Sequence, residues 1–223
     1  MKEGKKISLV IPTKNEEKNL QKVLDSIPSY IDEIIVVDGY STDRTVEIAK
    51  KNKCKVYFDK YGKGSAVIFG VKKATGDYVI MMDADCSNRA IEFELLIAGL
   101  NAGYDFCFGS RFIQGGGSDD MPWVRKLGNK FFVSMVNLIW GTHYTDLCYG
   151  YRSFKKKMFE KLKLKSKGFS IETEMAIKVA KKGFNVLEVP SFEKAREAGE
   201  GKLRTFRDGW FILKKIIEEL LGD

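Results

Sequence analysis

Apolar and polar positions alternate along the first half of the chain in a pattern that predicts strands and helices in turn. Runs rich in apolar residues, typical of strands covered on both faces, occupy residues 7–11, 34–37, 55–58, 78–82 and 105–108. Apolar residues at helical spacing predict helices between these strands, over about residues 16–27, 41–51, 65–74 and 92–101. This alternation predicts an α/β layer fold with a largely parallel sheet and right-handed crossovers.

The first predicted helix carries start signals of its own. Asn15 is expected to be its N-cap, with Glu16 and Glu17 in the first turn, where carboxylates favour the positive end of the helix dipole.

The second half of the chain is less regular. A Gly-rich loop at residues 114–120 leads into an apolar, helix-like stretch at 123–140. Further along, the pattern predicts a helix over 171–182, a strand over 185–189 that Pro190 ends, and an amphipathic helix over 206–221. We find no internal repeat and no linker-like boundary.

Composition excludes several classes of protein. The chain has 223 residues, of which 44% are hydrophobic and 30% charged, as in ordinary globular proteins rather than collagen-like, disulfide-scaffold or disordered chains. No stretch approaches the roughly 18–20 uninterrupted apolar residues of a membrane span. The first apolar run ends at Pro12 without a small-residue cleavage site, so we expect no signal peptide.

Cysteine, histidine and net charge narrow the picture further. The four cysteines form no C-x-x-C pair and His143 is the single histidine, which argues for reduced thiols in a cytoplasmic protein and against a zinc site. We expect His143 to be a loop or core residue. The net charge of +8 suits an anionic partner such as nucleic acid, a phosphorylated substrate or an anionic membrane, or simply a lysine-rich surface.

Acidic residues follow the predicted strands. Asp83-Ala84-Asp85 comes directly after the strand at 78–82, and ligands of parallel sheets bind beyond such strand ends. Two carboxylates there can hold Mg²⁺ or Mn²⁺ and leave positions open for phosphate oxygens. Glu16 and Asp38 follow the first two strands and suit the hydroxyl groups of a ribose, while the turn at 62–64, which contains Lys63, can bring backbone N–H groups to a phosphate.

Several segments, taken in order, resemble the family 2 glycosyltransferases with the GT-A fold. They are Val10-Ile11-Pro12-Thr13-Lys14-Asn15-Glu16, Val36-Val37-Asp38, Gly62-Lys63-Gly64-Ser65-Ala66, Ala74-Thr75-Gly76-Asp77-Tyr78 and Asp83-Ala84-Asp85. The dolichol-phosphate mannose synthase-like branch is indicated by Ser110-Arg111-Phe112, Gly115-Gly116-Gly117, Asp146-Leu147 and Gly150-Tyr151-Arg152. The resemblance covers about residues 6–205. It implies a Rossmann-like GT-A catalytic domain over 1–205, followed by an amphipathic helix over 206–223.

The resemblance implies how a nucleotide-sugar donor is bound. Residues that would bind the donor are Pro12, Thr13, Asn15, Glu16, Asp38, Lys63, Asp83, Ala84, Asp85, Arg196 and Lys202. Of these, Asp83 and Asp85 would also hold Mg²⁺ or Mn²⁺, and Arg196 and Lys202 would belong to a segment that closes over the donor diphosphate.

The resemblance also implies the acceptor and the reaction. Arg111 and Arg125 would bind the phosphate of a polyprenyl phosphate, and these two arginines with Asp85 and Asp146 would form the catalytic set. A hexose would pass from GDP-mannose or a UDP-hexose to the lipid phosphate with inversion. Because a phosphate nucleophile is already ionised at neutral pH, no strong general base is required, and cationic groups at the leaving diphosphate should dominate the rate.

Three positions depart from the family pattern. Gly39 stands where the family usually has a second aspartate, which leaves the base and the sugar open between GDP-mannose and a UDP-sugar. Ser87 takes the place of a glutamine metal ligand, and Gly201 replaces the serine that directly precedes the lysine of the closing segment, here Lys202.

Two apolar stretches bear on membrane contact. The stretch at 123–140 is apolar almost all round, and the helix at 206–221 has Phe206, Trp210, Leu213, Ile217 and Leu220 at helical spacing beside Arg204, Arg207, Lys214 and Lys215. Basic residues beside an apolar face fit a helix that lies in the interface of an anionic membrane. The alternative is that both stretches pack on the core or in a homodimer. We expect peripheral attachment to the inner face of the membrane, with a membrane partner subunit or a homodimer as further options.

Other functions stay open at this point. A soluble saccharide or phosphorylated acceptor is one, and a hydroxyl acceptor would need a base, for which Asp146 is the nearest candidate. A sugar-nucleotide pyrophosphorylase is disfavoured because no Gly-rich loop follows the first strand. A nucleic-acid-binding module lacks any recognisable motif, so no nucleic-acid partner is expected. On the helix at 171–182, Glu172 and Glu174 do not share a face, and we expect Glu174 to point inward.

Overall fold

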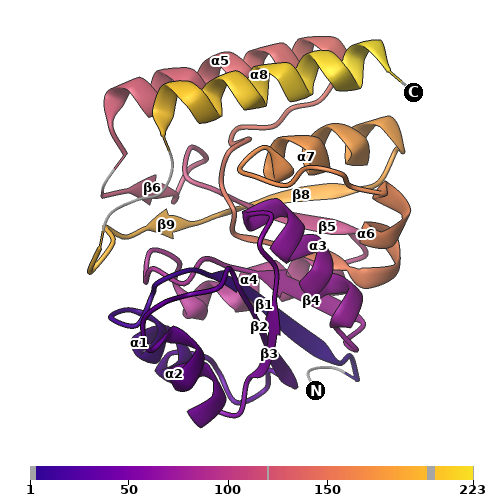
Figure 1. The fold of residues 1–223 in the computed structure, drawn as a ribbon. Helices are drawn as coiled ribbons and strands as arrows, with labels where there is room; N and C mark the ends of the chain where they lie inside the picture. The colour runs from indigo at the N-terminus through magenta and orange to yellow at the C-terminus, as the bar shows by residue number, and fades with distance from the viewer. Residues whose placement is uncertain (1–3, 120, 200–203, 223) are drawn as a thin grey trace.

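A central sheet of seven strands organises the protein, which a computed structural model describes over residues 4–119, 121–199 and 204–222. The strand order is β3-β2-β1-β4-β7-β5-β8 (Figure 1). The strands are β1 (Ile7–Thr13), β2 (Glu33–Asp38), β3 (Lys55–Phe58), β4 (Tyr78–Met81), β5 (Phe106–Ser110), β7 (Arg152–Lys155) and β8 (Val186–Pro190). A separate parallel pair joins β6 (Gly117–Ser118) to β9 (Phe192–Glu193).

Strands β1, β2, β4 and β5 are almost entirely buried, which is why their sequences are rich in apolar residues. Strand β1 lies in the middle, parallel to both β2 and β4, and Leu9, Val10 and Ile11 on it have no exposed surface. The carboxyl ends of β1, β2 and β4 therefore lie at one edge of the sheet, where Thr13, Asp38 and Met81 end the three strands.

Strand β7 was missed by the sequence analysis. It runs antiparallel between β4 and β5 and so joins the two halves of the sheet. Its sequence, Arg-Ser-Phe-Lys, does not read as a buried strand, yet Arg152, Ser153 and Phe154 are all fully buried. Arg152 is accommodated because its guanidinium group donates to three backbone carbonyl oxygens, those of Leu147, Tyr149 and Glu172.

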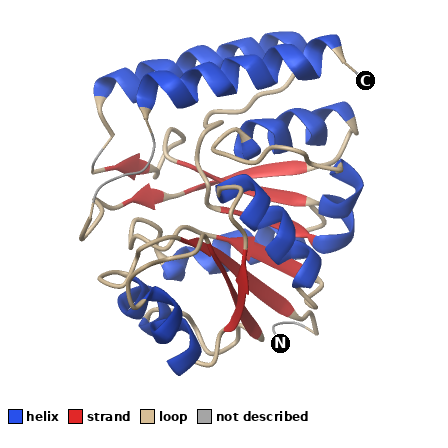
Figure 2. Ribbon diagram, viewed as in Figure 1, coloured by secondary structure: helices blue, strands red, loops and turns tan. Residues whose placement is uncertain are grey.

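Helices cover both faces of the sheet in layers (Figures 1 and 2). One apolar core contains side chains of α1 (Leu20–Asp25), α2 (Thr45–Lys51) and α4 (Phe93–Asn101). The core on the opposite face contains side chains of α3 (Lys63–Lys73), α5 (Trp123–Trp140), α6 (Lys156–Leu162), α7 (Ile171–Lys181) and α8 (Thr205–Leu221). The predicted α/β architecture is thus confirmed.

The outermost layer consists of α5 and α8, which lie side by side above α7 (Figure 1). Ile212 and Ile216 of α8 are buried in the second core, so this helix is part of the folded domain. None of the helices in the described ranges is long and apolar enough to cross a bilayer.

Several predicted boundaries were wrong. Asn15 does not cap α1: its φ is 51°, and the helix begins at Leu20 after a turn in which the carbonyl oxygen of Glu16 accepts from the N–H groups of Asn19 and Leu20. Asn15 instead ties its loop to the next one, because it accepts from the N–H of Thr42. Helix α6 and strands β6 and β9 were not predicted.

Candidate active site

Asp83 and Lys63 form the centre of the candidate site. Asp83 lies just beyond β4, and Lys63 is the first residue of α3, after Gly62, whose φ of 119° suits glycine. The ammonium group of Lys63 lies 2.7 Å from Oδ1 and 3.0 Å from Oδ2 of Asp83. Burial alone would lower the pKa of Lys63, but the charges of Asp83 and Glu172 outweigh burial and raise it.

Glu172 on α7 is the second partner of Lys63 and was not among the predicted site residues. Its Oε1 lies 3.0 Å from Nζ of Lys63, and only 2% of its side chain is exposed. We expected only Glu174 to point inward. Both glutamates are buried, but Glu174 faces the loop before α7, where it accepts from the N–H groups of Lys165 and Ser166.

Gly150 makes the close approach of these groups possible. A Cβ atom at this position would lie 2.6 Å from Nζ of Lys63, 3.1 Å from Oε1 of Glu172 and 3.2 Å from Oδ2 of Asp83. Any larger residue would therefore disrupt the cluster. The absence of a side chain at Gly150 lets the ammonium group of Lys63 lie directly against a carboxylate of the predicted metal pair.

Asp85, the other aspartate of the pair, forms an ion pair with Arg196. Its Oδ2 accepts from Nη2 of Arg196 at 2.8 Å, and its Oδ1 accepts from the hydroxyl and the N–H of Ser87. Nη1 of Arg196 lies 3.2 Å from both carboxylate oxygens of Glu16, which is itself buried. The structure thus brings together Glu16, Asp85 and Arg196, three of the predicted donor-binding residues.

The predicted nucleoside side lies at the ends of β1 and β2. Asp38 is fully buried and accepts from the hydroxyl groups of Thr13 and Ser41, so it fixes the two loops that follow these strands. Pro12 is half-buried beside Thr13, and Ala84 is buried between the two aspartates. A pocket of about 210 Å³ opens next to these loops and is lined by Asn15, Glu16, Glu17, Lys18, Asn19, Asp43, Ala198 and Gly199.

Arg111 and Asp146 form a second centre. Arg111 follows β5 and makes a two-point contact with Asp146, with Nε 2.6 Å from Oδ2 and Nη2 2.9 Å from Oδ1. Its Nη1 also donates to Glu193 at 3.1 Å, and its guanidinium lies over the ring of Tyr149 with 4.5 Å to the centroid. Burial would lower the pKa of Arg111, but Asp146 and then Glu193 raise it. Phosphate binding by Arg111 stays a prediction, and it would place the phosphate among these carboxylates.

Arg125 lies where α5 meets α8. Its Nε donates to the hydroxyl of Thr205, the first residue of α8, at 3.2 Å. Lys202 lies outside the described residues. The predicted roles of Arg125 and Lys202 therefore stay predictions.

Arg152 contacts backbone groups next to both centres. It is fully buried over the ring of Phe108, at 4.0 Å from the centroid, and it holds the carbonyl oxygens of Leu147 and Tyr149 in the loop after Asp146. Its Nη1 donates to the carbonyl of Glu172 at 2.7 Å. One side chain thus fixes both the Asp146 loop and the start of α7.

The aspartate pair suits a divalent cation. Mg²⁺ is commonly held by one or two carboxylates together with phosphate oxygens and water, and Asp83 and Asp85 offer such oxygens. Burial and the charge of Asp85 raise the pKa of Asp83, while the charge of Lys63 acts in the opposite direction. Within the described residues, no three acidic, cysteine or histidine side chains come together as a complete metal site. The remaining ligands would have to come from donor and solvent.

The profile of Glycosyl transferase family 2 matches residues 8–163. The chain belongs to glycosyl transferase family 2. This membership confirms the family inferred from the motifs and favours an enzyme over a nucleic-acid-binding module.

Named relatives of this family 2 protein cover most of the chain. It is 36% identical over 211 residues to the dolichol-phosphate mannosyltransferase of Pyrococcus furiosus, covering 89% of this chain but 59% of that protein. It is 30% identical to the dolichyl-phosphate hexose transferase of Haloferax volcanii, covering 97% of this chain and 95% of that one. The polyprenol monophosphomannose synthase of Mycolicibacterium smegmatis is 29% identical, with 87% and 80% covered.

Solved structures share the fold. Glucosyl-3-phosphoglycerate synthase from Mycobacterium tuberculosis, crystallised with Mn²⁺, UDP and glucosyl-3-phosphoglycerate, superposes with a TM-score of 0.79 at 20% identity, covering 99% of this chain and 81% of that one. A further mycobacterial protein gives a TM-score of 0.82 at 18% identity, with 99% and 76% covered. The family 2 protein thus has the GT-A fold that the motifs implied.

Proposed function

We propose that this family 2 protein transfers a hexose from a nucleotide diphosphate sugar to a polyprenyl phosphate, with inversion at the anomeric carbon. The observation that carries the proposal is the set of relatives named for dolichyl or polyprenyl phosphate, which align with 87–97% of the chain. The Haloferax relative is almost the same length as this chain, so the alignment accounts for the whole fold described above.

The geometry of the site supports donor binding at the edge of the sheet. Loops that Asp38 and Thr13 fix would receive the nucleoside, and Asp83 and Asp85 would hold Mg²⁺ or Mn²⁺ at the diphosphate. A structural neighbour was crystallised with Mn²⁺ and UDP, which supports this pairing of metal and nucleotide. When bound, the metal ion supplies a Lewis acid for the departing diphosphate. Lys63 and Arg196 lie against the same two carboxylates, so they are placed to stabilise charge that develops on the leaving group.

The acceptor side requires positioning more than proton transfer. An ionised phosphate attacks without a general base, so Asp146 would act through Arg111, which it holds in a two-point contact. Arg111 and Arg125 would then bind the acceptor phosphate. Asp146 is a positioning residue in this scheme.

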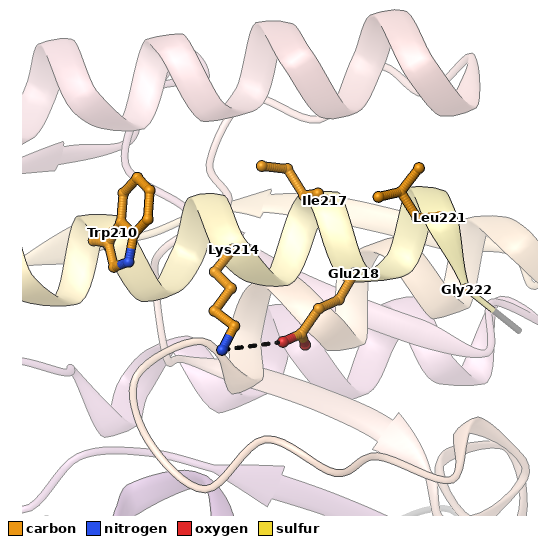
Figure 3. A pocket seen from close by; sticks show the side chains of 6 residues that line it. All are labelled: Trp210, Lys214, Ile217, Glu218, Leu221 and Gly222. Carbon is orange, nitrogen blue, oxygen red and sulfur yellow. Dashed lines mark ion pairs between the residues drawn. The ribbon is translucent and has the colours of Figure 1, made fainter.

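The outer layer of the protein supports contact with a membrane surface. On α5, Trp123, Leu127, Phe131 and Leu138 are exposed, and on α8 so are Phe206, Trp210, Phe211, Ile217, Leu220 and Leu221. A recess of about 500 Å³ lies on this layer, lined by Trp210, Lys214, Ile217, Glu218, Leu221 and Gly222 (Figure 3). Exposed apolar side chains on two adjacent helices, with lysine and arginine beside them, suit the interface of an anionic bilayer.

We therefore propose that the protein attaches peripherally to the inner face of the membrane through this layer, which we call the α5/α8 face. A polyprenyl acceptor resides in the bilayer, so attachment would bring its phosphate to Arg125, which lies in the first turn of α5 and contacts the start of α8. A homodimer or a membrane partner that covers the same face is the competing arrangement.

The experiment that tests the function is sugar transfer from a labelled panel of UDP- and GDP-sugars, with Mg²⁺ or Mn²⁺, into an organic phase that contains polyprenyl phosphate. Label in the lipid phase that EDTA abolishes is the expected result, and it identifies both sugar and base. Metal-dependent consumption of donor without label in the lipid would overturn the lipid acceptor in favour of a soluble one. No turnover of any donor would overturn the proposal as a whole.

A further inference from the structure

The ammonium group of Lys63 contacts both the half-buried carboxylate of Asp83, a member of the predicted metal pair, and the buried carboxylate of Glu172. Nζ of Lys63 contacts Asp83 at 2.7 Å and Glu172 at 3.0 Å, and only 14% of the Lys63 side chain is exposed. Asp83 comes from the strand end that would bind the donor. Glu172 comes from α7, and none of the sequence motifs assigned it a role.

Two cations act on the buried carboxylate of Glu172: Lys63 in direct contact, and the buried Arg152, whose charged form Glu172 favours. Its Oε1 forms no well-aligned hydrogen bond within the described residues, although Lys63 lies within ion-pair distance. A buried carboxylate without a full set of hydrogen bonds is unfavourable, and an apolar residue would cost less at such a position. Within the described residues, Lys63 is the cation in ion-pair contact with Glu172, so this pair is the direct contact that offsets the burial of its carboxylate.

The backbone of Glu172 is held firmly. Its carbonyl oxygen accepts from Arg152 at 2.7 Å, and Gly150 leaves space for its carboxylate with almost no margin. The position of the Glu172 carboxylate is thus fixed by its surroundings, whereas the long side chain of Lys63 has several rotatable bonds.

We propose that Glu172 is a positioning residue that shares the Lys63 ammonium with Asp83, so that Asp83 can bind a metal ion while Lys63 stays beside it as a second cation for the donor diphosphate. The inference rests on the proposed role of Asp83 in binding the metal. Without the charge of Glu172, Lys63 would pair with Asp83 alone and compete with the metal ion for that carboxylate.

The charges define the expected effects. Lys63, Asp83 and Glu172 together carry one excess negative charge, which favours a divalent cation. Glu172→Gln removes this excess and leaves Lys63 on Asp83, so it should weaken Mn²⁺ binding by about tenfold, as is common when a group that orients a metal ligand is lost. Lys63→Met removes the competing cation and should strengthen Mn²⁺ binding to the protein without donor.

The test measures Mn²⁺ affinity of the full chain by electron paramagnetic resonance of the free ion, without donor. If Glu172 acts through Lys63, Glu172→Gln in the Lys63→Met background should weaken binding less than it does in the wild type. Glu172→Asp, which restores the charge one methylene further away, should bind Mn²⁺ with intermediate affinity. Glu174→Gln is the matched control, since Glu174 is buried on the same helix and pairs with Lys178 instead. Its Mn²⁺ affinity should equal that of the wild type.

Two failures are distinguishable. Wild-type Mn²⁺ affinity in a folded Glu172→Gln variant, or equal losses in both backgrounds, would overturn the positioning role while leaving the metal site in place. Absence of Mn²⁺ binding to the wild type, both alone and with UDP or GDP, would instead overturn the metal assignment of Asp83 and the inference with it.

Discussion

Arg196 donates from its Nη2 to Oδ2 of Asp85 across 2.8 Å, although 111 positions separate the two residues in the chain. The same guanidinium contacts Glu16 in the loop after β1. The segment after β9 is thereby drawn over the edge of the sheet where the donor would bind. The contact parallels that of Lys63 with Asp83, so each aspartate of the pair faces one cation that also contacts a buried glutamate.

Arg196→Ala should separate metal binding from donor binding. Removing the guanidinium frees Asp85, so Mn²⁺ alone should bind more tightly, whereas the donor loses a cation at its diphosphate and its KM should rise by about tenfold, the effect of roughly 1.4 kcal/mol. Calorimetry with Mn²⁺ and initial rates with donor measure the two effects. Arg44→Ala, which alters an exposed ion pair with Glu17, is the control. Changes of the two affinities in the same direction would contradict the assignment of Arg196 to both groups.

Asp85→Asn should abolish metal-dependent turnover and leave the fold intact. The amide keeps a carbonyl oxygen for Ser87 but removes the negative charge from a loop position, so we expect at least a hundredfold lower rate with Mg²⁺ and an unchanged melting temperature. Asp105→Asn, which alters a carboxylate paired with Lys155 elsewhere on the sheet, is the control for loss of charge. Retained turnover in Asp85→Asn would refute the metal role.

Arg125→Ala should impair use of the acceptor more than binding of the donor. Arg125 lies at the junction of α5 and α8, beside the exposed apolar layer, so its loss should raise the KM for polyprenyl phosphate by about tenfold and leave the donor KM within about twofold. Initial rates at varied donor and acceptor concentrations measure both constants. The exposed neighbour Lys126→Ala controls for a general loss of positive charge on α5. The reverse pattern would mean that donor and acceptor phosphates have been exchanged.

The fold was predictable where local pattern and burial agree. Strands β1, β2 and β4 are buried on both faces, and their apolar runs indicated this directly. Strand β7 was missed because Arg152 stands at its start, and a buried arginine is stabilised by carbonyl oxygens that only the folded chain supplies. Asn15 looked like a helix cap because local sequence does not show that the loop after β2 offers it a partner.

The residues of the candidate site that belong to short motifs were predictable from the sequence, but the ion pairs that connect them were not. Asp83, Asp85 and Arg196 were recognised from short segments, and the structure brings the last two into contact. Glu172 and Glu193 were missed, since each acts on a cation that lies far away in sequence, Lys63 and Arg111 respectively. The two glutamates at positions 172 and 174 of a predicted helix drew attention to Glu172. The helical periodicity, however, assigned only Glu174 to the inward face.

Membrane attachment should depend on the exposed side chains of the α5/α8 face rather than on the whole of α8. Deleting α8 would remove Ile212 and Ile216 from the core, so point changes are the sharper test. Trp210→Glu combined with Leu138→Glu should reduce recovery with phosphatidylglycerol vesicles by at least tenfold, because each buried apolar side chain contributes about 1.5–3 kcal/mol. Co-sedimentation measures the recovery.

The control for vesicle binding is Leu95→Glu, an exposed apolar position on α4, which packs on the opposite face of the sheet. Its recovery should match the wild type. If the double variant is recovered with vesicles as well as the wild type is, the membrane proposal is wrong. A shift from dimer to monomer in that variant would show that a second copy covers the α5/α8 face.

The stability of the fold at acid pH should depend on Glu33 at the start of β2. Its carboxylate accepts hydrogen bonds from Ser8 on β1, from Lys55 on β3 and from Thr75 before β4. Burial would raise its pKa, but hydrogen bonds from Lys55, Ser8 and Thr75 outweigh burial and lower the pKa from 4.5 to about 2. A lowered pKa stabilises the fold above the unfolded value, so this contribution is complete above about pH 4.5 and is lost as the pH falls towards 2.

Glu33→Gln should remove that pH dependence. Because 48% of the Lys55 side chain is exposed and the pair is partly screened, we expect a loss on the order of 2 kcal/mol in the free energy of unfolding at pH 7, and a much smaller loss near pH 2.5. Urea unfolding at a series of pH values measures the difference, and Glu47→Gln on the exposed side of α2 is the control. If the wild type and Glu33→Gln lose stability in parallel between pH 5 and 2.5, the carboxylate of Glu33 is not the group that links folding to pH.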